Sequence, residues 1–88
     1  MWYVYILRCR DGSLYTGIST DVDKRILRHN QGKGSQYTRS RRPVTLLYTE
    51  PYVLKSDALK REVQIKRLSV KNKKRVIMSE SSQRFPSA

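Results

Sequence analysis

The first fifty residues consist of short apolar segments separated by turn-forming residues, whereas the last third of the chain has helical spacing. Residues 2–7 (WYVYIL) are apolar or aromatic throughout and mostly β-branched or aromatic, which is typical of a strand buried on both faces. Turn residues 10–13 (RDGS) separate them from a second such segment at 14–18, so the pattern predicts a β-hairpin. A third strand is predicted at 44–48.

The first predicted helix follows the hairpin. Thr20 and Asp23 are spaced as a capping box, which places the helix between Thr20 and about residue 31. Gly32 is then the left-handed residue that ends it. Residues 32–43 are predicted to be a loop.

A second helix is expected from residue 56 or 57 to about 70, and a short third helix over 73–79 after a break near Asn72. The order ββαβαα predicts an α+β fold, in which a three-stranded, mainly antiparallel sheet is flanked by helices. Residues 1–80 are expected to form a single domain. The Ser- and Pro-containing segment 81–88 is expected to be a disordered tail.

The register of the hairpin decides whether Tyr5 and Tyr15 share a face, because a slip of one residue inverts every side chain. A two-residue turn at 11–12 would put the tyrosines on opposite faces. A three-residue loop at 10–12, with Gly12 left-handed, pairs Tyr5 with Gly17 and puts both tyrosines on one face. We predict the second register, because Gly17 has no Cβ and clears space opposite Tyr5.

Glu62 is conspicuous in the second predicted helix. It lies about 40° from Ala58 on the helical wheel, inside the apolar stripe of Leu59, Val63 and Ile65, whereas Arg61 falls on the opposite face. A buried carboxylate needs a partner. One interpretation is a structural salt bridge, and the other is a ligand for a divalent metal ion that completes its shell with water and phosphate oxygens.

Arg25 and His29 are four residues apart in the first predicted helix and therefore share a face. Each alone is ordinary beside the apolar stripe of that helix. Together they are interpreted as phosphate-facing donors, because a guanidinium group matches phosphate oxygens in a bidentate way.

Charge narrows the class of partner. Nineteen Lys and Arg residues against seven Asp and Glu give a formal net charge of +12, which opposes compaction and indicates a polyanionic partner such as nucleic acid. A basic surface without such a partner is the alternative. With one cysteine and one histidine, the chain has neither an internal disulfide nor a Cys/His zinc site. Its longest apolar run is too short to cross a membrane, so a cytoplasmic location is expected.

Residues 3–5 (YVY), followed ten positions later by residues 15–17 (YTG), resemble the paired motif of the GIY-YIG nuclease superfamily. Arg25 matches the helix arginine of that family, His29 matches a position usually occupied by His or Tyr, and Glu62 matches its metal-ligand glutamate. The resemblance covers residues 2–78 and is greatest to the small stand-alone bacterial members, whose biological role is uncharacterised.

Three positions depart from the family pattern. Tyr3 and Thr16 replace Gly and Ile of the family name. Ile18 stands where many active members carry a lysine, so a cation near the scissile phosphate is missing or is supplied by Lys33 or Lys24. Asn72 is the candidate for the family's late asparagine, and Lys66 is a further candidate site residue.

The resemblance implies a metal-dependent endonuclease that hydrolyses phosphodiester bonds in DNA. In that mechanism Tyr15 is the general base with Tyr5 or His29 in support, Arg25 clamps the phosphate, and Glu62 holds one Mg²⁺ or Mn²⁺. A phenol has a reference pKa of about 10, whereas an imidazole has one near 6.5, so His29 is the alternative base.

The basic residues are expected to contact the phosphate backbone, which predicts weak sequence preference and strong dependence on salt. The residues expected to make these contacts are Lys24, Lys33, Arg39, Arg41 and Arg42. DNA is the expected partner and RNA the alternative, with a protein partner directing the activity. A catalytically idle nucleic-acid-binding module of the same fold is the competing hypothesis, and an accessory protein bound to RNA or ribosomes is a third.

Overall fold

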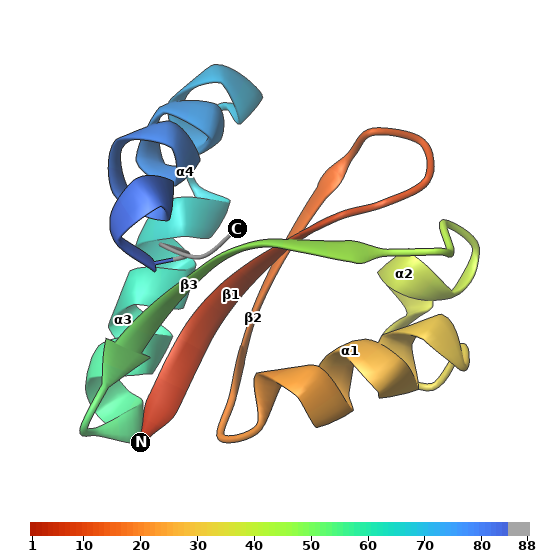
Figure 1. Ribbon diagram of the computed structural model, residues 1–88, viewed down its shortest axis with the longest axis horizontal. Coiled ribbons are helices and arrows are strands. Elements are labelled where there is room, and N and C mark those ends of the chain that lie inside the picture. Colours follow the sequence, from red (N-terminus) through yellow and green to blue (C-terminus); the bar gives the residue numbers. More distant parts are fainter. Residues whose placement is uncertain (85–88) are drawn as a thin grey trace.

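The computed structural model describes residues 1–84 as a three-stranded sheet with helices on both faces (Figure 1). The elements, in chain order, are β1 (Trp2–Arg8), β2 (Leu14–Ser19), α1 (Val22–Asn30), α2 (Gln36–Arg39), β3 (Thr45–Tyr52), α3 (Lys55–Lys66) and α4 (Val70–Arg84). The sheet order is β2-β1-β3, and both pairings are antiparallel. The predicted α+β fold is therefore confirmed, with the short helix α2 added inside the predicted loop.

The hairpin has the predicted register. Tyr5 is paired with Gly17 and Leu7 with Tyr15. Gly12 has a φ of 85°, and the Cys9 N–H donates to the Ser13 carbonyl (2.8 Å), which closes the three-residue loop. Tyr5 and Tyr15 consequently lie on the same face of the sheet.

The alternation of side chains divides the hydrophobic core into two layers. On one face Val4 and Ile6 of β1 pack with Tyr48 of β3 and with Ala58 and Ile65 of α3. On the other face the buried cluster consists of Tyr5, Leu7, Cys9 and Val44, and Val22 and Ile26 of α1 pack against it. Figure 1 shows α3 and α4 on one side of the sheet and α1 and α2 on the other.

The start of α1 differs from the capping-box prediction. The N-cap is Asp21, whose side chain accepts from the Lys24 N–H at 3.1 Å, and Thr20 is exposed. Ser19 holds the preceding turn, because its hydroxyl bonds both the N–H and the carbonyl of Asp21. Because of this turn, the helix begins one residue later in the chain than predicted. Gly32 has a φ of 81°, as predicted for the residue that ends the helix.

The other boundaries also shift. β3 continues through Pro51 to Tyr52 instead of ending at 48, which an edge strand tolerates because one side of its ladder is unpaired. α3 begins at Lys55, slightly before the predicted start.

The last helix begins earlier than predicted and is longer. The break precedes Val70 rather than falling near Asn72, because the Ser69 hydroxyl accepts from the Asn72 N–H and starts α4 there. α4 includes residues 81–84, where the tail was expected to begin, and residues 85–88 lie outside the described part of the chain.

The orientation of α3 corrects the helical-wheel prediction. Leu59 and Val63 are 42% and 45% exposed, and Arg61, assigned to the solvent face, points inward. Arg61 binds the buried carboxylate of Glu50, with Nε–Oε1 at 2.9 Å and Nη2–Oε2 at 3.0 Å. This ion pair turns α3 toward β3, so that the buried face is centred on Ala58 and Ile65.

Tyrosine hydroxyls complete the cluster around Glu50. Tyr48 and Tyr52 both donate to its carboxylate. Burial acts to raise the pKa of Glu50, but the hydrogen bonds from Arg61, Tyr48 and Tyr52 outweigh burial, and the pKa lies below its usual value. Glu50 is therefore ionised at neutral pH and fastens α3 to β3.

Within the described residues, the apolar helical stretches are too short or too charged to cross a lipid bilayer.

Candidate active site

The site is built around Tyr5 of the central strand. Tyr5 is 1% exposed, and its ring centroid lies 6.4 Å from that of Tyr15. A Cβ at Gly17 would lie 2.5 Å from the Tyr5 hydroxyl oxygen, so the side chain extends across Gly17 to the β2 edge of the sheet. The role predicted for Gly17, to clear space opposite Tyr5, is thus confirmed.

His29 of α1 is fully buried against both tyrosines. Its Nε2 lies 2.9 Å from the Tyr5 hydroxyl, its Nδ1 lies 2.7 Å from Thr38 Oγ1, and its ring meets the Tyr15 ring edge-on at 5.1 Å. Burial and then the nearby Arg25 charge lower the pKa of His29, so the imidazole is neutral at pH 7. The prediction that His29 faces phosphate is wrong for this structure, because both ring nitrogens are engaged inside the protein.

Two hydroxyls hold the imidazole in place. Thr38 Oγ1 lies 2.7 Å from His29 Nδ1 and 2.9 Å from Ser35 Oγ, and the Tyr5 hydroxyl lies at Nε2. In a neutral imidazole one ring nitrogen donates and the other accepts, so one of the two hydroxyls donates to His29 and the other accepts from it. His29 thus orients the Tyr5 hydroxyl and has no free nitrogen with which to activate water.

Gly34 is the second glycine that makes room for this chain of hydrogen bonds. A Cβ built on Gly34 would lie 2.1 Å from His29 Nδ1, closer than real contacts allow. We expect Gly34→Ala to displace His29 or the loop and to lower the free energy of unfolding by about 1–3 kcal/mol, as overpacking does. Thermal or urea unfolding measures the loss, and Gly12→Ala is a useful comparison, because its penalty is backbone strain (φ 85°) with no atom within 4 Å of the added Cβ. A Gly34→Ala protein with unchanged stability and an unchanged His29 NMR signal would contradict this packing.

Arg25 and Glu62 approach the same phenol from two helices. Burial raises the pKa of Tyr5 above its usual value, the Tyr15 and Glu62 charges act in the same direction, and the Arg25 guanidinium opposes them by its charge and hydrogen bonding. Tyr5 is therefore a protonated, neutral phenol at physiological pH. The Tyr15 ring packs against Tyr5, and the Arg25 and Glu62 charges act on the Tyr5 hydroxyl, so residues of β2, α1 and α3 contribute to this site.

Glu62 is largely buried and forms a salt bridge, and its carboxylate also fits the alternative interpretation as a metal ligand. Its carboxylate Oε2 lies 3.4 Å from Lys66 Nζ, and its side chain is 17% exposed. No group of three or more His, Cys, Asp or Glu residues that could cage a metal ion occurs in the described part of the chain. A single, partly accessible carboxylate with one ion-pair partner nevertheless fits Mg²⁺, which binds proteins through one or two carboxylates and retains water or phosphate ligands.

Tyr15 differs from Tyr5 in having an available hydroxyl. Tyr15 is half-buried, and its hydroxyl makes no hydrogen bond to any described residue. Its ring stacks on Tyr37 at 6.0 Å, and the Arg41 guanidinium lies 4.0 Å from the centroid of the Tyr37 ring. Tyr37 of α2 therefore packs on the candidate catalytic tyrosine.

The predicted basic contacts separate into two groups. Lys24, Lys33 and Arg39 are exposed. Arg41 pairs with Asp11 at 3.1 Å, and Arg42 donates to the main-chain carbonyls of Arg39 (2.8 Å) and Asn30 (3.4 Å), so both also hold the loop in place.

The three remaining positions that the sequence singled out are Ile18, Asn72 and Lys66, and none of them is shown in contact with Tyr5. Ile18 packs against the cluster of Val4 and Ile6 on the α3 face, so position 18 supplies no positive charge near Tyr5. Asn72 is exposed in the first turn of α4, and none of the described hydrogen bonds joins it to Tyr5 or Tyr15. Lys66 reaches the site through its ion pair with Glu62.

Sequence reasoning missed Gly34 and Thr38. The signal was present in Ser35, whose side chain accepts from the Thr38 N–H and starts α2. A serine three residues before a threonine is a recognisable start of a short helix. Its effect is to place Thr38 under the imidazole.

Comparison with known proteins defines the class to which this fold and site belong. The family model of the GIY-YIG catalytic domain matches residues 1–75, and the chain belongs to the GIY-YIG family. This finding confirms the resemblance to that family inferred from the sequence.

The relatives specify a branch of that family. The chain is 53% identical to UPF0213 proteins of Staphylococcus saprophyticus and Staphylococcus aureus over 75 residues, which covers 85% of this chain and 92% of each relative. The solution NMR structure of a UPF0213 protein from Bacillus halodurans matches with a TM-score of 0.60 and 46% identity, covering 91% of this chain and 86% of that one. A protein of E. faecalis, also solved by NMR, matches with a TM-score of 0.62 and 40% identity over 88% and 82% of the two chains.

Proposed function

We propose that the protein is a metal-dependent endonuclease that hydrolyses phosphodiester bonds in DNA with low intrinsic sequence specificity. The observation that carries this proposal is the surroundings of the Tyr5 hydroxyl, on which Tyr15, Arg25 and Glu62 all act. A phenol, a guanidinium and a carboxylate at one place supply a base, a phosphate clamp and a metal ligand. A protein that only binds polyanions gains nothing from the carboxylate.

The proposed roles follow from accessibility. Tyr15 activates the attacking water, because its hydroxyl is available, whereas the Tyr5 hydroxyl and His29 Nε2 are already hydrogen-bonded to each other. Arg25 binds the non-bridging oxygens of the scissile phosphate. Glu62 would hold one Mg²⁺ or Mn²⁺, which when bound stabilises the negative charge on the leaving oxygen. Tyr5 and His29 are positioning residues that keep this end of the sheet ordered.

A catalytically idle nucleic-acid-binding module is the second candidate. The ion pair between Glu62 and Lys66 favours it, because a paired carboxylate has a structural use without a metal ion. Ile18, at the position of the family lysine, packs in the core and supplies no charge to the site. The two candidates differ in whether Glu62 is needed for turnover.

Nicking of supercoiled plasmid in Mg²⁺ or Mn²⁺ tests the proposal. We expect Glu62→Gln and Arg25→Ala each to reduce the nicking rate by about 10²–10³-fold, the loss typical of removing one group that stabilises transition-state charge. Asp57→Asn on α3 and Arg28→Ala on α1 are matched controls, because both residues are exposed and carry the same charge on the same helices. We expect these controls to retain wild-type rates.

Two results would contradict the proposal. Metal-independent cleavage that survives in purified Glu62→Gln protein would indicate a contaminating nuclease or a different mechanism. DNA binding without any metal-dependent cleavage, tried on plasmid, branched DNA and RNA, would favour the idle module.

A further inference from the structure

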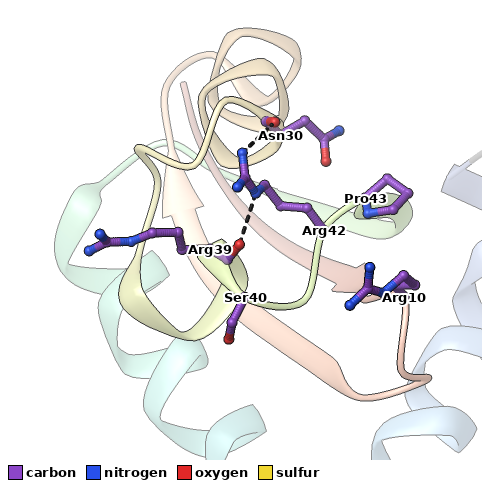
Figure 2. Close-up of a pocket in the computed structure, with 6 residues that line it drawn as sticks. All are labelled: Arg10, Asn30, Arg39, Ser40, Arg42 and Pro43. Carbon is purple, nitrogen blue, oxygen red and sulfur yellow. Dashed lines mark hydrogen bonds between the residues drawn. The ribbon is translucent and has the colours of Figure 1, made fainter.

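A basic hollow lies between the C-terminal end of α1 and the segment that leads from α2 to β3. It has a volume of about 520 Å³ and is lined by Arg10, Asn30, Arg39, Ser40, Arg42 and Pro43 (Figure 2). Of these lining residues three are arginines and none is acidic. The nearest acidic residue in sequence, Asp11, is already bound to Arg41. The hollow therefore carries positive charge without a compensating carboxylate.

Arg42 is fixed in the middle of the hollow. Figure 2 shows its guanidinium between Asn30 and the main chain of Arg39, with Arg10 and Pro43 on the side away from Arg39. Its Nε donates to the Arg39 carbonyl (2.8 Å) and one Nη to the Asn30 carbonyl (3.4 Å), so two of the five guanidinium N–H groups are used. A Cβ at Gly32 would lie 2.9 Å from Arg42 Nη1, so glycine at this position leaves room for the guanidinium. The remaining three donors are thus held in place by the main chain.

The hollow is connected to the candidate active site through the segment that carries Tyr37 and Arg41. Asn30 follows His29 in α1, and Arg42 follows Arg41, whose guanidinium lies on Tyr37, which in turn stacks on Tyr15. The Arg10 N–H donates to the Arg41 carbonyl at 2.9 Å and ties the β1–β2 loop to the same segment. A strand whose scissile phosphate lies at Tyr15 and Arg25 would have its neighbouring phosphates on this side of the molecule.

We propose that this hollow binds backbone phosphates of the nucleic-acid strand next to the scissile one, with Arg10, Arg39 and Arg42 as the ligating residues. The inference rests on the proposed function only in that the partner is a nucleic acid, and it adds Arg10 as a contact that sequence reasoning did not include. Guanidinium groups match phosphate oxygens in a bidentate way and remain charged at any relevant pH. The contacts are to phosphate, so they set the position of the strand and do not read its sequence.

The test measures binding, without cleavage, in Glu62→Gln protein with EDTA. Fluorescence anisotropy of a labelled short DNA duplex gives the Kd at several salt concentrations for Arg10→Ala, Arg39→Ala and the control Arg75→Ala. The side chains of Arg10 and Arg39 are exposed, and the hydrogen bonds made by the main chain of these two residues do not depend on their side chains. Arg75 is an exposed arginine on α4, and α4 lies on the opposite side of the sheet from α1 and α2. Arg42→Ala is left out because it would also remove the two bonds that fix the loop.

We expect Arg10→Ala and Arg39→Ala each to weaken binding by about tenfold at low salt, the weight of one charge-assisted hydrogen bond. Each should also reduce the slope of log Kd against log salt by about 0.9, the contribution of one phosphate contact. Arg75→Ala should change neither quantity by a comparable amount. Equal losses in all three variants would overturn the inference, because they would reflect net charge alone.

Inorganic phosphate serves as a second probe and distinguishes a site for nucleic-acid backbone phosphates from a site for a free phosphate ion. If phosphate shifts the backbone NMR signals of Arg10 and Ser40 while the two substitutions leave DNA affinity unchanged, the hollow is a small-anion site and the inference is wrong.

The outcomes that test the endonuclease proposal differ from those that test the hollow. A wild-type protein that binds without cleaving, with the expected slopes, supports the hollow and not the nuclease. Cleavage with unaffected slopes supports the nuclease and not the hollow.

Discussion

Tyr15→Phe is expected to lower the metal-dependent nicking rate by about 10²–10⁴-fold, the range for loss of a general base. The substitution removes only the hydroxyl, and this hydroxyl has no hydrogen-bond partner among the described residues. The ring, its stacking on Tyr37 and its contact with His29 remain. Stability and DNA affinity should therefore stay close to wild type while turnover is lost, which single-turnover nicking and anisotropy measure separately.

Tyr37→Phe is the matched control. It makes the same chemical change on the ring that stacks on Tyr15, and we expect it to retain the wild-type rate. Tyr5→Phe should lie between the two, with a loss of about tenfold, because its hydroxyl positions His29 and does not contact water directly. A Tyr15→Phe protein with full activity, beside an inactive His29→Gln protein, would assign the base to the imidazole and show that His29 leaves its buried position during turnover.

The hairpin was predictable because its geometry is local. Gly12 requires a left-handed residue at one position of the loop, and this requirement fixes the pairing of Tyr5 with Gly17. The shared face of the two tyrosines follows from that pairing. Arg25 and His29 were placed on one helical face for the same reason, since a spacing of four residues is a property of the helix itself.

The environment of His29 was not predictable from spacing, because it depends on a segment distant in the sequence. Thr38 reaches the imidazole only because α2 forms within a glycine-containing loop, and Gly34 is needed because that loop crosses directly over Nδ1. Residue 29 has the same position on the helix whether its side chain faces a phosphate or is buried. Only the packing of residues 34–38 distinguishes between them.

The rotation of α3 has a similar cause. The apolar spacing of Leu59 and Val63 predicts one buried face, but an ion pair between α3 and β3 selects another. Glu50 lies next to Pro51, in a part of β3 that looks like a turn in the sequence, so its burial and its binding of Arg61 could not be inferred. Glu62 remained near the site because it lies on the same side of the rotated helix as Ala58 and Ile65.

Arg61→Met is expected to lower the free energy of unfolding by about 3 kcal/mol, because it leaves the Glu50 carboxylate buried with only tyrosine hydroxyls as partners. That is a large part of the stability of a small domain, for which about 5–15 kcal/mol is typical. Urea unfolding at pH 7 measures the loss. Arg67→Met is the matched control, because Arg67 is an exposed arginine at the end of the same helix and has no acidic partner among the described ion pairs.

The pH dependence gives an independent reading of the same ion pair. The pKa of Glu50 lies below its usual value of 4.5 in the folded protein, so the folded state binds its proton less readily than the unfolded state. The stability from this group is therefore complete above about pH 4.5 and is lost as the pH falls through the lowered pKa. Removing Arg61 removes the main hydrogen-bond partner of the carboxylate, so the stability of Arg61→Met should fall less steeply in acid than that of the wild type. Parallel pH curves for the two proteins would mean that Arg61 contributes packing and not charge.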